Sequence, residues 1–152
     1  MQCWGSNVEG SLGVGYSDST FIPESCPNSG ACSTTPVPVA GLPPIAHVAA
    51  HFGQVCAVGV DGHAYCWGTP SQTSPASVDV CGSQNPICVP VPKMVQGVEQ
   101  ATSIAVGYGH ACVLTTASQV LCWGLDTHGQ LGRGNGPDWD PTPATIVIPP
   151  EP

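Results

Sequence analysis

Two stretches of the chain alternate apolar residues with polar or small residues on either side of a short turn. Residues 54–68 read QVCAVGVDGHAYCWG, and residues 110–124 read HACVLTTASQVLCWG. Alternation with a period of two is typical of strands that have one buried face, and a turn containing Gly and Asp closes hairpins. No window of helical length carries apolar residues at helical spacing without an internal Gly or Pro. The pattern therefore predicts an all-β chain built from antiparallel hairpins.

Each hairpin belongs to a longer repeated unit. Residues 48–68 align without a gap on residues 104–124, and a third Cys-Trp-Gly motif begins at Cys3. The loop EGSLGVG at residues 9–15 recurs as HGQLGRG at residues 128–134. A Pro-x-Pro segment also recurs, beginning at Pro36, Pro90 and Pro141.

The tryptophans of the three motifs are Trp4, Trp67 and Trp123, which gives periods of 63 and 56 residues. A fixed period near fifty residues is typical of stacked units such as propeller blades. Because the three tryptophans occupy the same position in each repeat, we expect all of them to pack between blades. We expect a single array over residues 1–152, with a partial repeat over about 1–47 and full repeats over 48–103 and 104–152.

Taken together, these motifs resemble the regulator-of-chromosome-condensation repeat, in its bacterial secreted type with Cys-Trp-Gly motifs. The resemblance rests on Gly107, His110 and Cys112, on the Cys-Trp-Gly motifs, and on the G-x-L-G-x-G loops with their Pro-x-Pro segments. Members of this family form seven-bladed β-propellers, so the resemblance implies blades of antiparallel strands. Two full repeats and a partial one then imply an incomplete propeller of about two and a half blades, expected to be part of a longer propeller.

Nine cysteines favour a disulfide framework. Directly opposite residues in a non-hydrogen-bonded antiparallel pair lie close enough for a disulfide, and the spacing of ten fits such a staple across each hairpin. Two further pairs each lie inside one insertion between the repeated motifs. The predicted disulfides are Cys26–Cys32, Cys56–Cys66, Cys81–Cys88 and Cys112–Cys122. Cys3 is left over, and by alignment its partner is expected upstream of Met1. The disulfides predict a secreted, periplasmic or cell-surface protein.

Charge and spacing argue against several classes of partner. The net charge is −8, and Lys93 and Arg133 are the only Lys or Arg side chains. Nucleic-acid binding is driven by clustered Lys and Arg that release counterions from the phosphates, so no nucleic-acid partner is expected. No apolar run is long enough to predict a transmembrane helix, so no membrane insertion is expected. The cysteine spacings do not match the close pairs of structural zinc sites, so no metal or cofactor is expected.

The sequence contains no motif that predicts catalysis. None of its histidines lies in an H-E-x-x-H pattern, and no G-x-S-x-G elbow is found. The family resemblance implies a structural role for His110, through a bond to the neighbouring backbone. Asp138 and Asp140 flank Trp139 in a turn bounded by prolines, and two interpretations stay open. The turn is solvated with Trp139 capping the last blade, or Trp139 anchors a partner.

The resulting hypothesis is a non-enzymatic, protein-binding repeat module of a secreted or cell-surface propeller, which presents loops to a protein partner. Asp138, Trp139 and Asp140 are its candidate partner-binding residues. The alternative is a carbohydrate-binding or carbohydrate-active propeller, although converging carboxylates are not found. The resemblance also implies guanine-nucleotide exchange as a possible activity. The net charge of −8 and the nine cysteines disfavour it. An open propeller also exposes two blade faces, which predicts either further blades or self-association.

Overall fold

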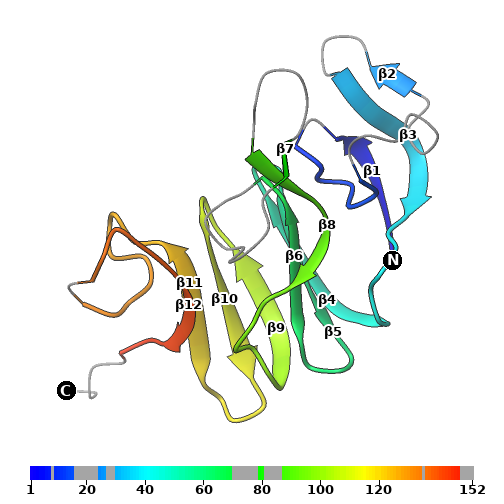
Figure 1. The fold of residues 1–152 in the computed structure, drawn as a ribbon. Coiled ribbons are helices and arrows are strands. Elements are labelled where there is room, and N and C mark those ends of the chain that lie inside the picture. The colour runs from blue at the N-terminus through cyan, green and yellow to red at the C-terminus, as the bar shows by residue number, and fades with distance from the viewer. Residues whose placement is uncertain are drawn as a thin grey trace.

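Three antiparallel sheets stand side by side in the computed structural model, like neighbouring blades in a row (Figure 1). The structure describes residues 1–7, 9–15, 24–26, 30–69, 79–80, 87–134 and 136–147. The N-terminal and C-terminal sheets lie at opposite ends of the row. Every regular element in the described ranges is a strand. The prediction of an all-β, incomplete propeller of about two and a half blades is therefore confirmed.

The sheets follow one another along the chain. The N-terminal sheet has the order β1-β3-β2, with β1 at Gln2–Ser6, β2 at Glu24–Cys26 and β3 at Gly30–Pro38. The middle sheet has the order β4-β5-β6-β8-β7, with strands at Ile45–His51, Gln54–Gly59, Ala64–Gly68, Ile87–Met94 and Asp79–Val80. The C-terminal sheet has the order β9-β10-β11-β12, with strands at Ala101–Val106, His110–Thr115, Val120–Leu125 and Trp139–Thr145.

The two predicted hairpins are present with the predicted register. Cys56 lies opposite Cys66 across β5 and β6, and Cys112 lies opposite Cys122 across β10 and β11. The Cα atoms of each pair are 4.1 Å apart, and each pair forms a disulfide. A third disulfide joins Cys26 to Cys32, while Cys81 lies outside the described residues, so its pairing with Cys88 stays a prediction.

The Cys-Trp-Gly motif forms the same irregularity in every sheet. The ladder to the outer strand shifts register between the cysteine and the glycine in β1, β6 and β11. The glycine after the tryptophan has a positive φ, which is +95° at Gly68. A side chain at Gly68 would also strike the carbonyl group of Gly53. Only glycine fits this bulge without strain, which explains why the tripeptide recurs intact.

Two apolar clusters hold the row of blades together. The cluster between the N-terminal and middle sheets contains Trp67, Val55 and Val89 among its buried members. The cluster between the middle and C-terminal sheets is built around Trp123 and includes Val58. The middle sheet is therefore covered on both faces, which explains why every residue of β5 is buried and why its sequence is nearly continuously apolar.

The N-terminal blade is a half blade. β6 and β11 pair with a neighbour on each side, whereas β1, which carries the same motif, pairs only with β3 among the described strands. Its other edge lies where β5 and β10 lie in the following blades. Within the part of the chain that the structure describes, the surface beside this edge of β1 therefore lies open.

Candidate functional site

A strip of exposed aromatic rings crosses from the middle blade to the C-terminal blade. Phe52, in the turn after β4, and Tyr108, in the turn before β10, are 74% and 64% exposed. Their ring centroids lie 5.4 Å apart with the planes at 71°, an edge-to-face contact, and His51 stacks beside Phe52 at 6.3 Å. We call His51, Phe52 and Tyr108 the aromatic strip. Large exposed aromatic rings at a fixed spacing are typical of binding surfaces.

Hydrogen bonds fix the two turns that carry the strip. The N–H of Thr69 donates to the Gly53 carbonyl at 3.0 Å, and the N–H of Leu125 donates to the Gly109 carbonyl at 2.8 Å. The Thr69 hydroxyl also donates to the Phe52 carbonyl at 3.1 Å and contacts the carboxylate of Glu9. These bonds tie each turn to the end of the following Cys-Trp-Gly strand, so the rings are presented from a rigid base.

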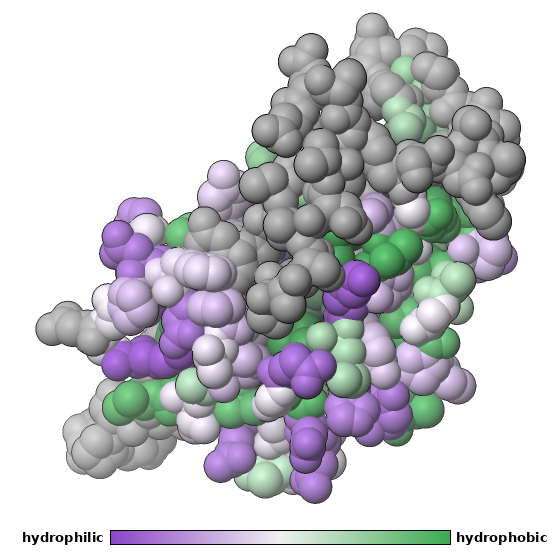
Figure 2. Space-filling view, in the orientation of Figure 1, coloured by the Kyte–Doolittle hydropathy of each residue, from purple (hydrophilic) through white to green (hydrophobic). Residues whose placement is uncertain are grey.

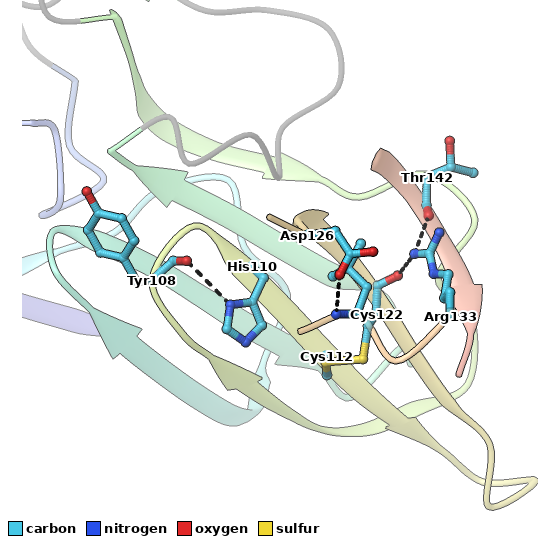
Figure 3. The surroundings of a disulfide bond; sticks show 8 residues. Tyr108, His110, Cys112, Cys122, Asp126, Arg133 and Thr142 are labelled. Atoms are coloured by element: carbon cyan, nitrogen blue, oxygen red, sulfur yellow. Dashed lines mark hydrogen bonds between the residues drawn. A yellow bond between two sulfur atoms is a disulfide. The ribbon is translucent and has the colours of Figure 1, made fainter. Parts of the chain in front are cut away.

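His110 supports the Tyr108 turn, as the family resemblance implies. Its ring Nδ1 lies 3.4 Å from the Tyr108 carbonyl oxygen, and a side chain on Gly107 would collide with the imidazole (Figure 3). The ring therefore packs against its own turn and positions the backbone of Tyr108. This placement gives His110 a structural role.

A hollow beside the strip widens the candidate surface. It has a volume of about 480 Å³ and lies between the open edge of β1 and strand β4, with Met1, Cys3, Leu12, Val48 and Phe52 among its lining residues. In Figure 2, hydrophobic residues gather where β1 and the middle sheet meet. An apolar hollow next to exposed aromatic rings is a surface that can take an apolar side chain of a partner.

The thiol of Cys3 is half-buried in this region and has no disulfide partner among the described cysteines. It packs against the apolar cluster around Trp67. Burial raises the pKa of the Cys3 thiol above its ordinary value. The thiolate, which is the nucleophilic form, is therefore disfavoured at neutral pH.

The prediction that all three motif tryptophans pack between blades is correct for two of them and wrong for the third. Trp67 and Trp123 are 1% and 0% exposed, but Trp4 is 65% exposed. The three side chains occupy equivalent places in their strands. They differ because no described blade covers the outer face of the first blade.

The segment around Trp139 lies at the other end of the row. Asp140 accepts a hydrogen bond from the Thr142 N–H at 2.8 Å and an ion-pair contact from Arg133 at 2.6 Å. The Thr142 N–H, followed by the Arg133 guanidinium, lowers the pKa of Asp140. Arg133 also donates to the carbonyl groups of Cys122 and Thr142 (Figure 3). Asp140 therefore holds the glycine-rich loop against β12.

Its two neighbours are more accessible. Asp138 is exposed and its carbonyl accepts a hydrogen bond from the Asp126 N–H at 2.7 Å, while Trp139 is 42% exposed. The structure thus brings Asp140 to Arg133 and leaves parts of Asp138 and Trp139 at the surface. A partner-binding role for these three residues stays a prediction.

The described residues offer no metal site and no membrane-spanning helix. No group of three His, Cys, Asp or Glu side chains in the described ranges is placed to hold a metal ion. In the same part of the chain, no helix reaches the length and apolar character needed to span a bilayer.

Sequence reasoning missed the aromatic strip, although a signal for it was present. Phe52 aligns with Tyr108 in the repeat, and each lies next to a glycine with positive φ. Loop residues of a blade lie at the surface, and both aromatic residues fall in a predicted loop. The recurrence therefore predicts an exposed ring in the middle blade and another in the C-terminal blade.

Comparison with known proteins identifies one repeat and several similar proteins. Residues 101–130 match the family model of the Regulator of chromosome condensation (RCC1) repeat. The chain is 34% identical over 137 residues to the RCC1 domain-containing protein RUG3, mitochondrial, of Arabidopsis thaliana, covering 89% of this chain and 28% of that protein. It is 41% identical over 49 residues to the human probable E3 ubiquitin-protein ligase HERC4, covering 31% of this chain and 5% of the ligase.

Solved structures show the same fold. Prp20p from Saccharomyces cerevisiae, whose structure was described together with its binding to Gsp1p and histones, matches with a TM-score of 0.75 at 22% identity. The match covers 97% of this chain and 34% of Prp20p. Human WBSCR16 matches with a TM-score of 0.68 at 23% identity over 96% of this chain and 32% of its own. The chain therefore spans about a third or less of the proteins that it matches.

Proposed function

Because the chain is built from RCC1-type repeats, we propose that it is a non-enzymatic protein-binding module that contacts a protein partner through the aromatic strip. The observation that carries this proposal is the edge-to-face contact between Phe52 and Tyr108, two rings from different blades that both remain largely exposed. Aromatic side chains are enriched among the residues that dominate binding energy at protein interfaces. The hollow beside Phe52 adds a place for an apolar anchor.

The relatives support protein binding as the class of function. Prp20p is described with Gsp1p and histones, and a second structure shows yeast RCC1 (Prp20) bound by Kap60. The ligase HERC4 matches over only 5% of its length, so its activity gives no reason to propose catalysis for this chain. Exposed turns on a rigid sheet scaffold are where such repeats carry variable contacts.

An oxidising compartment forms the second part of the proposal. Three disulfides lie within the described residues, and cytosolic thiols are normally kept reduced. We therefore propose a secreted, periplasmic or cell-surface location. Asp138 and Trp139, at the start of β12 in the C-terminal blade, are a second candidate contact.

The test compares Phe52→Ala/Tyr108→Ala with Val60→Ala, which removes an exposed apolar side chain from the hairpin turn between β5 and β6. Proteins retained by the immobilised wild-type chain are identified by mass spectrometry, and the affinity of each is then measured for the wild type and for both variants. We expect the double variant to weaken binding by at least thirtyfold, as loss of a hot spot does, and Val60→Ala to leave it unchanged. Equal affinities for all variants, or binding to a glycan array in place of any protein, would contradict the proposal.

A further inference from the structure

Phe52 occupies a place in its turn that bulky side chains rarely take. The turn joins β4 to β5 through two residues, Phe52 and Gly53, and His51 pairs with Gln54 across it. The φ angles of Phe52 and Gly53 are +48° and +82°. Two-residue hairpin turns with positive φ at both positions are normally formed by Asn, Asp or Gly, which tolerate this conformation. The backbone of Phe52 is therefore strained, and asparagine at this position would relax it.

The fold gains little packing from the ring that causes this strain. Phe52 is 74% exposed, and its aromatic contacts are with His51 and Tyr108, which are themselves exposed. Figure 3 shows the Tyr108 ring turned away from His110 and the disulfide. Backbone strain is concentrated at functional sites, where a side chain is held in place for a purpose other than stability. The strained turn therefore indicates that the Phe52 ring serves recognition.

A carboxylate lies beside this turn. Glu9 contacts the Thr69 hydroxyl, which also donates to the Phe52 carbonyl at 3.1 Å. A Cβ atom on Gly53 would collide with the Oε2 atom of Glu9. Glu9 is only partly buried, and its other carboxylate oxygen, Oε1, accepts no hydrogen bond from the described residues. One strong acceptor next to the aromatic strip is therefore left for a ligand.

No basic side chain of this protein neutralises that carboxylate. Lys93 and Arg133 are the only Lys and Arg side chains of a chain with a net charge of −8. Arg133 forms an ion pair with Asp140 at 2.6 Å. Lys93 lies in β8, which β5 and β6 separate from β4 in the middle sheet. The strip thus combines exposed ring faces with a nearby carboxylate, and it has no Lys or Arg of its own.

We propose that the aromatic strip and Glu9 bind an arginine side chain of the protein partner. The planar guanidinium lies on the face of Phe52 or Tyr108, where the negative face of the ring attracts it, and donates a hydrogen bond to Glu9 Oε1. This inference rests on the proposed function, because it states which chemistry a partner must bring to the strip. Asparagine in place of Phe52 would relax the turn but would offer no ring face.

The test titrates the whole chain with N-acetyl-arginine methylamide and follows the backbone amide signals by NMR at pH 7.5, where an ordinary histidine is mostly neutral. The matching citrulline compound keeps the shape of the side chain and removes its charge. We expect saturable binding of the arginine compound in the millimolar range, with shifts at Phe52, Gly53 and Tyr108, and at least tenfold weaker binding of the citrulline compound. Equal binding of the two compounds, or binding of neither, would overturn the proposal.

Single variants assign the binding to the named residues. Glu9→Gln should weaken binding of the arginine compound about threefold, as loss of an exposed ion pair does. Glu99→Gln removes the same charge from an exposed position in the loop between β8 and β9, and it should leave binding unchanged. Equal affinities of the two variants would overturn the role of Glu9.

Phe52→Asn separates recognition from folding. This variant should abolish the shifts at Tyr108 and yet melt at a temperature no lower than the wild type, because asparagine tolerates the positive φ of the turn. A lower melting temperature would show that the ring serves the fold, and undiminished binding would show that it does not hold the guanidinium. Either result would overturn the proposal.

These results are distinguishable from failure of the proposed function. If Phe52→Ala/Tyr108→Ala weakens binding of the retained proteins but the arginine compound does not bind, the strip is a protein contact and the arginine inference alone is wrong. If the double variant binds the retained proteins as tightly as the wild type does, the proposed function is wrong, whatever the arginine compound does.

Discussion

Replacing Trp67 with alanine should destabilise the chain far more than the same replacement at Trp4. Trp67 is 1% exposed and Trp4 is 65% exposed, although both follow the cysteine of the same motif. A fully buried aromatic side chain removes about 150–250 Å² from water, which at about 25 cal/mol per Å² is roughly 4–6 kcal/mol. When a buried tryptophan or phenylalanine is replaced by alanine, the free energy of unfolding typically falls by about 3–5 kcal/mol.

The indole hydrogen bond adds a smaller contribution that can be measured separately. Trp67→Phe keeps an aromatic ring against Val39 and Val55 but removes the N–H that donates to Ser11. Loss of that bond should cost about 1 kcal/mol, in addition to the smaller ring volume. Trp4→Ala loses only the third or so of its surface that is buried, which corresponds to about 1–2 kcal/mol.

Urea unfolding followed by circular dichroism measures these differences, provided that the slope of free energy against urea is unchanged between variants. We expect the loss in the urea midpoint to be smallest for Trp4→Ala, larger for Trp67→Phe and largest for Trp67→Ala. Equal, small losses at Trp4 and Trp67 would show that the cluster between the first two blades does not hold the fold together, and would refute this reasoning.

Two further predictions concern the C-terminal blade. The double variant Cys112→Ser/Cys122→Ser opens a disulfide-closed loop of about ten residues and should lower the free energy of unfolding by about 3 kcal/mol. Urea unfolding with and without a reductant measures this loss. An unchanged midpoint would show that the cross-strand disulfide does not stabilise the blade. The pKa of Asp140 is lowered first by the Thr142 N–H and then by Arg133, so its contribution to stability is complete above the ordinary carboxyl pKa and is lost as pH falls through the lower, folded value. Thermal melts between pH 6 and about pH 2 should therefore show a smaller acid loss for Asp140→Asn than for the wild type, and identical acid limbs would mean that the ion pair does not stabilise the loop.

Local patterns in the sequence were sufficient for the hairpins, their register and their disulfides. Alternation of apolar residues sets which face of a strand is buried, and the turn sets which residues lie opposite each other, so Cys56 had to face Cys66 and Cys112 had to face Cys122. The period of the Cys-Trp-Gly motif likewise predicted stacked blades, because each blade repeats the same bulge. These features depend on residues that are close along the chain.

What surrounds each motif was decided only by the tertiary structure. Trp4, Trp67 and Trp123 have the same local sequence, but their burial depends on whether another blade lies against that face, and no pattern inside the motif contains this information. Phe52 and Tyr108 form one aromatic strip although they are far apart in the chain, because stacking brings equivalent turns of neighbouring blades together. Strand pairing is specified locally by the pleat and the turn, whereas exposure is a property of the packed array, and the candidate binding surfaces follow from exposure.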